Sequence, residues 1–195
     1  MRAVTVVLLA LIGLPAFGQE GMFVGLGLGS FDYKESTVDP VFGDRSDTVS
    51  SYKVYGGFEF HEHVAAEVSY SRADDVEGNV SGNDPFLGDF FSTTRTEFTT
   101  TTIKVVGQLP RDWGVLIGGL GYFDTDADID LDLMSDAGAF SASGAVSDDG
   151  LMAMLGIEWR FGRFGTGYGV RLEYEWWDVE DGDASTIGVG ISYRF

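Results

Sequence analysis

A run of aspartates between residues 124 and 132 is the stretch whose residue types and spacing most directly suggest chemistry. Its acidic side chains occupy every second position: Asp124, Asp126, Asp128, Asp130 and Asp132. Carboxylate oxygens are the ligands that Ca²⁺ and Mg²⁺ prefer, and an EF-hand loop has Gly at its sixth position and Glu at its twelfth. In a loop starting at Asp124 those positions hold Ile129 and Ser135. The calcium loop is therefore absent, and we expect at most a weak surface contact between these aspartates and divalent cations.

Two histidines, His61 and His63, flank Glu62 and are the only imidazoles in the sequence. An imidazole can ligate a metal or act as a general base near neutral pH. An exposed pair at positions i and i+2, with only Glu62 fixed beside it by spacing, also occurs by chance. We therefore predict no specific metal site, no cofactor and no catalytic residue.

The alternation that spaces the aspartates runs through most of the chain. Apolar and polar residues that alternate over several positions are typical of strands. Eight such segments are found, at about 22–33, 47–60, 64–74, 93–108, 113–126, 148–160, 167–178 and 184–195. Nothing after residue 18 has the pattern of an amphipathic helix, so the predicted fold class is all-β.

The connections between these segments alternate in length. The long ones are polar and lie at about 34–46, 75–92 and 127–147, and the short ones are residues 61–63, 110–112 and 163–165. Long loops on one rim and tight turns on the other are the organisation of an outer-membrane barrel, with the long loops outside the cell. We therefore predict an eight-stranded antiparallel up-and-down transmembrane β-barrel whose last strand closes against the first, Met22 to Ser30.

The two faces of each segment decide what the barrel encloses. In the last segment Val189 and Ile191 alternate with Gly190 and Ser192, and a similar contrast recurs in most other segments. A lipid-facing barrel needs an apolar outside and a polar lumen, and a lumen of eight strands is only wide enough for side chains. Charges inside must be paired, because an unpaired buried charge is costly. The predicted ion-pair network consists of Lys53, Glu59, Glu67, Lys104, Glu158, Arg171, Glu173, Glu175 and Arg194.

The first residues predict export. Arg2 precedes an apolar run, Val4 to Leu14, which is too short to span a bilayer as a helix. Small residues follow at Ala16 and Gly18, as they do before a signal-peptide cleavage site. We predict a signal peptide over 1–18 and one barrel domain over 19–195. The net charge of −19 excludes nucleic acid as a simple electrostatic partner.

The end of the chain resembles a known family. Arg171-Leu-Glu-Tyr-Glu-Trp176, Gly182-Asp-Ala184 and Gly188-Val-Gly-Ile-Ser-Tyr-Arg-Phe195 are similar to the last two strands of the OmpA transmembrane domain and of small outer-membrane barrels of the OmpX and Ail type. The resemblance implies a location in the bacterial outer membrane. It also implies that Tyr193 and Phe195 are the signal that the outer-membrane insertion machinery recognises. The residues that would match the ion-pair plug of the OmpA lumen are Glu67, Lys104, Glu158 and Arg171.

The fifth segment is apolar on both faces. Val115, Ile117 and Phe123 lie on one, and Leu116, Leu120 and Tyr122 on the other. The OmpA resemblance favours even positions facing inward. Gly114 to Phe123 is long enough to cross a bilayer, so Asp124 to Asp132 would line the inner side of a strand extension at the barrel mouth.

Function is expected at the outer rim, because the long connections are rich in Asp and Glu. We expect a structural or surface-interaction protein with a plugged lumen, acting in membrane integrity or adhesion. Its expected partners are outer-membrane lipid, lipopolysaccharide and the insertion machinery. The alternatives are a soluble secreted lipocalin-like barrel with an apolar ligand, a small pore, and a lipid A-modifying enzyme. The enzyme would need an extracellular His, whereas both histidines fall in a short periplasmic turn.

Overall fold

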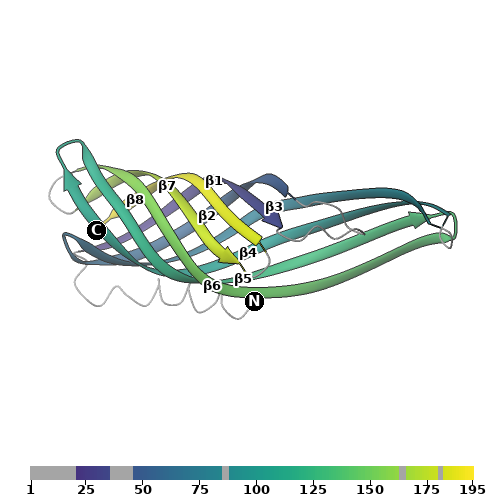
Figure 1. Cartoon of the computed structure of the whole chain (residues 1–195). Helices are drawn as coiled ribbons and strands as arrows, with labels where there is room; N and C mark the ends of the chain where they lie inside the picture. The colour runs from purple at the N-terminus through teal and green to yellow at the C-terminus, as the bar shows by residue number, and fades with distance from the viewer. Residues whose placement is uncertain (1–20, 36–45, 85–87, 163–165, 180–181) are drawn as a thin grey trace.

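The computed structural model describes residues 21–35, 46–84, 88–162, 166–179 and 182–195. Its strands are β1 (Met22–Glu35), β2 (Ser46–His61), β3 (Val64–Asp84), β4 (Gly88–Arg111), β5 (Gly114–Ser135), β6 (Gly138–Phe161), β7 (Gly167–Val179) and β8 (Gly182–Arg194). Each pairs antiparallel with its neighbours in sequence, and the sheet closes into a barrel (Figure 1). The predicted eight-stranded up-and-down barrel is therefore confirmed. The described residues contain no helix that is long and apolar enough to cross a membrane.

The closing seam joins β8 to β1, as predicted from the sequence. Val24 pairs with Tyr193 and Ser30 pairs with Ile187, and the Phe195 amide donates to the Met22 carbonyl oxygen at 3.0 Å. The turns after His61 and Arg111 are short, as expected. The expected turn at 163–165 and the expected signal peptide lie outside the described residues, and both stay predictions.

The inside and outside of the barrel have the polarity of a membrane protein. Leu26, Leu28 and Val189 point outward and are exposed, whereas Lys104 and Glu67 point inward and are buried. A soluble barrel has the reverse arrangement. The outward face therefore matches lipid, and the charged face lines the lumen.

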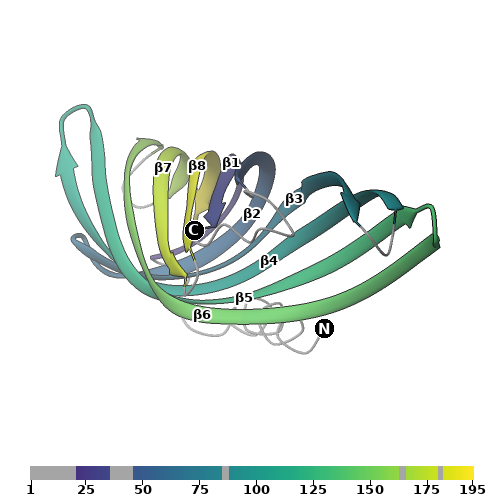
Figure 2. The ribbon, with the colours of Figure 1, turned by 45° about the vertical axis from the view of Figure 1, so that its right-hand side comes forward.

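Four strands continue far beyond the barrel, and here the predicted loops at 75–92 and 127–147 are wrong. The pairing of β2 with β3 ends at Ala73, and the pairing of β6 with β7 ends at Met152. The strands β3 to β6 nevertheless stay paired with each other to their tips, where β3 pairs Asp84 with Gly88 of β4. Figures 1 and 2 show this extension as a curved sheet on one side of the barrel mouth.

We call this extension the protruding sheet, defined as residues 76–84, 88–96, 129–135 and 138–144. Its segments are rich in polar and small residues, so each of them reads as a loop when it is considered alone. Cross-strand pairing supplies the strand structure that the single segments do not indicate. The predicted loop at 34–46 falls mostly on residues outside the described part.

The inward face of β5 is also corrected. Odd positions point inward, because Phe123 is fully buried whereas Leu120 is 73% exposed. The register explains the choice, since Gly121 pairs with the inward-facing Lys104. A Cβ at Gly121 would lie 2.6 Å from the Lys104 Cβ, so a glycine is needed beside the buried lysine. The aspartates from Asp124 to Asp132 therefore face outward, not inward.

Candidate functional site at the barrel lumen and mouth

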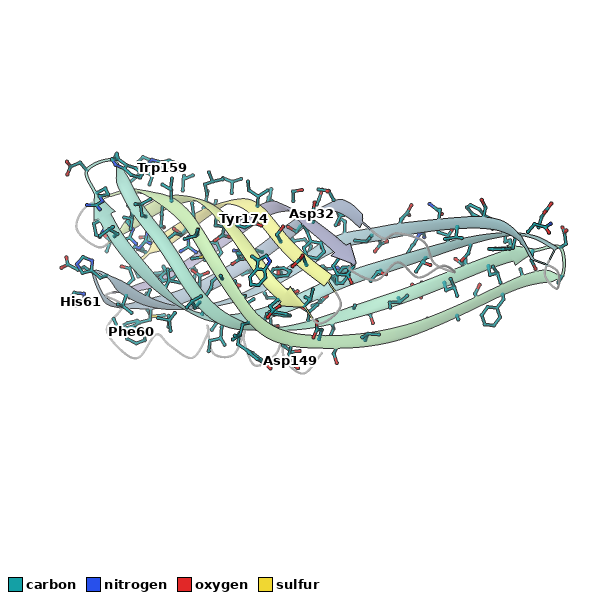
Figure 3. The ribbon with its side chains drawn as sticks, in the orientation of Figure 1. Asp32, Phe60, His61, Asp149, Trp159 and Tyr174 are labelled. Carbon is teal, nitrogen blue, oxygen red and sulfur yellow. The ribbon has the colours of Figure 1, made fainter. Side chains whose placement is uncertain are left out.

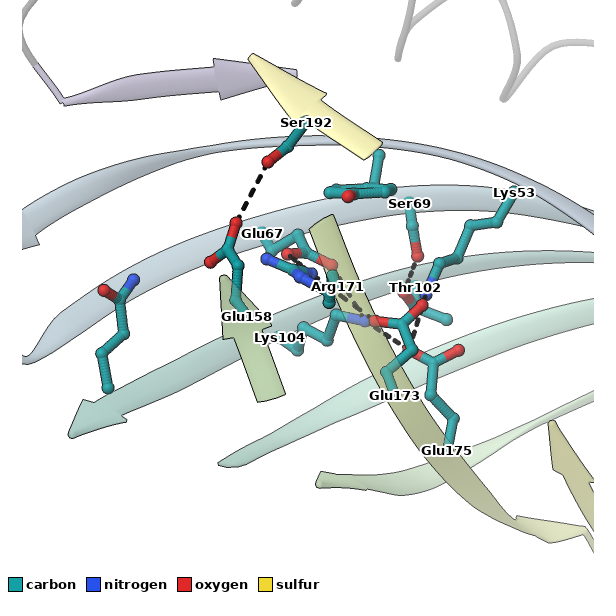
Figure 4. Close-up of polar contacts among 12 residues, drawn as sticks. Lys53, Glu67, Ser69, Thr102, Lys104, Glu158, Arg171, Glu173, Glu175 and Ser192 are labelled. Carbon is teal, nitrogen blue, oxygen red and sulfur yellow. Dashed lines mark hydrogen bonds and ion pairs between the residues drawn. The ribbon is translucent and has the colours of Figure 1, made fainter. Parts of the chain in front are cut away.

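The centre of the lumen is built around Glu67 of β3. Its carboxylate oxygens accept contacts from Lys104 Nζ at 3.0 Å and from Arg171 Nη1 at 2.6 Å. All three side chains are buried, and they come from β3, β4 and β7. One carboxylate therefore ties three strands together across the lumen, as Figure 4 shows.

The positive charges at this level have further partners on β7. Lys53 Nζ contacts Glu173 and lies 3.3 Å from Glu175 Oε1. Glu175 also accepts a hydrogen bond from Lys104, and Arg171 Nη1 lies 3.5 Å from Glu173 Oε2. Alternate positions of β7 face the same side, so Arg171, Glu173 and Glu175 reach the lumen in one row.

A second cluster lies nearer to the short turns. Arg194 Nη2 donates to Glu158 Oε2 at 2.7 Å, and its Nε donates to Glu59 Oε1 at 3.0 Å. Arg160 Nη2 donates to Glu59 Oε1 at 2.9 Å and to Gln108 Oε1 at 2.6 Å. Arg160 is the member that sequence reasoning missed, although it has the same parity as Glu158. With it, the cations and carboxylates of these two clusters are equal in number among the described residues.

Aromatic rings separate the two clusters. The Arg171 guanidinium lies 4.6 Å from the Tyr55 ring centroid and 5.8 Å from that of Phe23, and Arg194 lies 5.6 Å from the same Phe23 ring. A Cβ at Gly25 would lie 2.2 Å from the Tyr55 ring. Glycine on β1 thus makes room for the ring that packs against Arg171.

A second aromatic group lies across the lumen at the end from which the sheet protrudes. Phe31 lies 5.2 Å from Phe98 and 5.5 Å from Trp177, and Phe123 lies 6.1 Å from Trp177, measured between ring centroids. We call these four residues the aromatic layer. Phe31 could have been found from the sequence, because it shares the parity of Gly25, Gly27 and Gly29.

Two cavities lie on either side of the aromatic layer. The inner one holds about 20 Å³ and borders Lys53, Glu173 and Glu175. The outer one holds about 250 Å³ and opens at the barrel mouth, beneath the base of the protruding sheet. Phe31, Phe98 and Trp177 border both cavities. The aromatic layer therefore separates the lumen charges from the mouth.

The remaining predicted residues lie elsewhere. Tyr193 and Phe195 lie on the lipid-facing side with their rings 5.1 Å apart. The outward aspartates of β5 follow one another along the strand without converging, and no group of three acidic or imidazole side chains in the described part could hold a metal. His61 lies at the opposite end from the protruding sheet (Figure 3), and His63 lies beside it in the β2–β3 turn.

Comparisons with known proteins agree with this geometry. The family model of the outer membrane protein beta-barrel domain matches residues 4–195, and no curated protein matches the sequence. Among solved structures, the chain is similar to Ail, the attachment invasion locus protein of Yersinia pestis, in complex with the heparin analogue sucrose octasulfate. That match has 17% identity and a TM-score of 0.55, and covers 90% of this chain and 99% of that chain.

Neisserial surface protein A is a second similar structure, with 11% identity, a TM-score of 0.54, and coverage of 90% of this chain and 97% of that chain. At these identities the likeness concerns the fold alone. The family match spans nearly the whole chain, and it agrees with the lipid-facing outside of the closed barrel. The protein therefore belongs to the outer membrane protein beta-barrel domain family and resides in the bacterial outer membrane.

Proposed function

We propose that this protein is a surface-interaction protein of the outer membrane, with a closed lumen and with the protruding sheet as its working part. The observation that carries the proposal is the contrast along β3 to β6. Inside the barrel their inward side chains fill the lumen and form ion pairs. Beyond the barrel the four strands form a sheet with which no other described strand pairs. A barrel built for conduction would instead leave its lumen open as a channel.

Closure of the lumen rests on its packing. An eight-stranded barrel leaves room for little more than side chains, and here the ion pairs and both sets of aromatic rings occupy it. The inner cavity of about 20 Å³ is large enough for about one water molecule. We expect no steady conductance from the protein in a planar bilayer, and single-channel steps of porin size would contradict a closed lumen.

The outside position of the protruding sheet follows from membrane topology. Outer-membrane barrels have short turns on the periplasmic side, and the turns after β2 and β4 lie at the end opposite the sheet. The sheet then extends from the cell surface. Both histidines fall at the periplasmic end, so the expectation that the protein is not a lipid A-modifying enzyme stays in place as a prediction.

The outward face of the sheet suggests the charge of its partner. Asp130 and Asp132 are exposed on it, and the whole chain carries a net charge of −19. Ail was crystallised with a sulfated sugar, which is an anion. Complementary charge gives an interface its specificity, so we propose a basic partner for this chain in place of a sulfated one.

A shortened variant tests the surface role. Residues 77–95 and 130–143 are removed, and the paired residues Val76 and Thr96, and Ile129 and Gly144, are each joined by an Asn-Gly turn, which suits a two-residue hairpin. The barrel should still fold, and folding is checked by a difference in gel mobility between unboiled and boiled samples. Cells displaying it should lose the retention on a lysine-rich protein coat that the full chain confers.

A heparin coat is the matched surface for this experiment, and neither chain should increase retention on it. Equal retention of both chains on the lysine-rich coat would show that the protruding sheet is not the interacting part. Preferential retention on heparin would contradict the proposed basic partner.

A further inference from the structure

The edge of the protruding sheet that β6 forms is uncovered in the described structure. Residues 138–147 are exposed at every position, on both faces of the strand. Their backbone pairs with β5 on one side, whereas pairing with β7 on the other side begins only at Met152. Figure 2 shows β6 along this margin of the extension. No other described strand pairs with the segment, so its outer backbone N–H and C=O groups can take up a further strand.

The opposite edge of the sheet, formed by β3, is protected against such pairing. It has a register shift before Val76, and it carries Asp74, Asp75 and Glu77. Bulges and charged side chains keep sheet edges from adding a strand. Residues 138–147 contain no charged residue and no proline, and their register with β5 has no shift. Of the two edges, that of β6 is therefore the one open to a partner.

A second copy of the same segment is complementary to this edge. When two copies are antiparallel and centred on Ser143, Phe140 of each lies opposite Val146 of the other. Phe140 and Val146 are 58% and 59% exposed, and they share one face because successive side chains alternate. Aromatic and β-branched side chains opposite each other stabilise paired strands. On the other face Ser141 meets Ala145, so this register also brings no bulky or charged groups together.

The charge of the chain does not prevent this contact. The net charge of −19 opposes general association, but the nearest acidic column lies on β5, one strand in from the edge. Asp130 pairs with Ser143, so in the paired form two copies of Asp130 lie three strand spacings apart, about 14 Å. That separation exceeds the screening length of about 8 Å at physiological salt. The uncharged edge thus keeps the two acidic faces apart.

The direction of β6 decides which copies can meet. The strand runs from the tip of the sheet towards the barrel, so copies in one membrane are parallel and copies in facing membranes are antiparallel. On its outward side Asp149 is followed by Leu151, which marks the membrane boundary. Ser143 lies about seven residues beyond this boundary, so the paired form holds two membranes no more than about 50 Å apart.

We propose that residues 139–147 pair antiparallel with the same residues of a second copy in a facing membrane, so that the protein joins cells that display it. The pairing goes beyond the proposed basic partner, because it uses the edge of the sheet and not its outward face. It rests on the extracellular position of the sheet, but not on the charge of that face.

Single cysteines test the register, because the chain contains none of its own. Full chains with Ser143→Cys or Ala145→Cys are placed one per lipid nanodisc and oxidised in air. Two copies of residue 143 would be directly opposite, whereas two copies of residue 145 would be about 13 Å apart. We expect Ser143→Cys to link at least about tenfold faster, because a disulfide needs close Cβ atoms, and micrographs to show facing discs. Equal rates, or linked discs lying side by side, would overturn the pairing.

A charge exchange tests the same contact on cells. Cells that display the full chain should cluster and settle, and Ser143→Lys should prevent this because like charges then lie directly opposite. A mixture of Ser143→Lys cells and Ser143→Glu cells should settle again. Ser81→Lys, on the exposed edge of β3, is the matched control and should settle like the unmodified chain. A mixture that stays dispersed, or a loss shared by Ser81→Lys, would contradict the pairing.

Salt separates this pairing from the proposed basic partner. Clustering through an uncharged edge should persist in about 0.5 M salt, whereas retention on the lysine-rich coat should be lost by screening. Clustering without retention on the coat at low salt would contradict only the basic partner. Retention on the coat without clustering would contradict only the pairing of β6.

Discussion

Strands β3 to β6 run through both the barrel and the protruding sheet, and the polarity of their two faces changes from one region to the other. On β5 the outward face carries Leu116 and Leu120 within the barrel and Asp128 and Asp130 beyond it, while the inward face changes from glycine to Ile129. On β4 the inward face changes from Lys104 to Phe98, and the outward face from Ile103 to Arg95. On β4 and β5 the alternation of inward and outward side chains continues through this change without a shift, whereas β3 has a register shift between Ala73 and Val76. Only the surroundings of the outward face change, from lipid to water.

The change of polarity therefore marks the membrane boundary on each long strand. On β5 it falls between Tyr122 and Asp124, and on β6 between Asp149 and Leu151, which are paired with these positions. The two regions also differ in how they treat charge. The barrel buries its charges in pairs, whereas the protruding sheet leaves them in water. Each prediction below compares a change in one region with a matched change in the other.

The largest effect is expected from Arg171→Met in the lumen. It leaves Glu67 and Glu173 buried with one cation fewer, and breaking a buried ion pair from one side costs about 3–5 kcal/mol. Urea titrations in lipid vesicles, followed by the mobility of unboiled samples, measure the free energy of unfolding. The double variant Glu67→Gln/Arg171→Met should lose less than the sum of the two single variants, because the residues interact. Additive losses would contradict the coupling.

A next lower cost is expected from Leu155→Arg on the lipid-facing side of β6, where Leu155 is 70% exposed and pairs with Gly118 near the middle of the crossing. An arginine facing lipid costs about 2–4 kcal/mol near the bilayer midplane and less towards the interfaces. Asp128→Arg on the outward face of β5 lies beyond the membrane boundary, in water, and should change the free energy of unfolding by less than about 0.5 kcal/mol. Similar costs at the two positions would show that the boundary is misplaced.

A smaller effect is expected from adding a methyl group to a lumen glycine. At Gly121 a Cβ would lie 2.4 Å from the Ile103 carbonyl oxygen and 2.6 Å from the Lys104 Cβ, so Gly121→Ala should cost about 1–3 kcal/mol through overpacking. At Gly144 of the protruding sheet a Cβ would meet nothing within 4 Å. Gly144→Ala should be neutral or slightly stabilising in the same urea titration.

The smallest effect is expected at the exposed pair of Arg95 and Glu77, whose Nε and Oε1 atoms lie 3.2 Å apart. Exposed ion pairs contribute about 0–1 kcal/mol and are screened by salt. Arg95→Met should therefore change the unfolding midpoint little, and the change should shrink further in high salt. A loss as large as that of Arg171→Met would erase the distinction between the two kinds of ion pair.

Most of the barrel could be predicted because a single rule, alternation, assigns both the strand and its face. The rule placed Lys53, Arg171 and Glu175 inward, and the structure brings them together. It failed on β5, because Gly119 and Gly121 occupy inward positions and remove the contrast between the faces. There, only the register with Lys104 settles the direction of the side chains.

The extension of β5 through Asp132 was predicted, but the rest of the protruding sheet was missed for a related reason. Polar residues on both long connections suggest loops when a strand is expected to have lipid on its outward side. Once that side is in water, Asp130 alternating with Leu131 is an ordinary strand. The aromatic layer was missed as well, because Phe98 stands among threonines, and only the closed barrel brings it to Trp177.

The seam between β1 and β8 has a consequence for how the molecule is assembled. The eighth strand of the barrel supplies the partner of the first, so a chain without β8 would hold two unpaired edges in lipid. Each backbone group left unpaired in a bilayer costs several kcal/mol, and no partial barrel is therefore a stable resting state. Insertion is expected to be all-or-none. The protruding sheet lies in water, and no further described strand pairs with its outer strands β3 and β6, so it can fold strand by strand before or after the barrel closes.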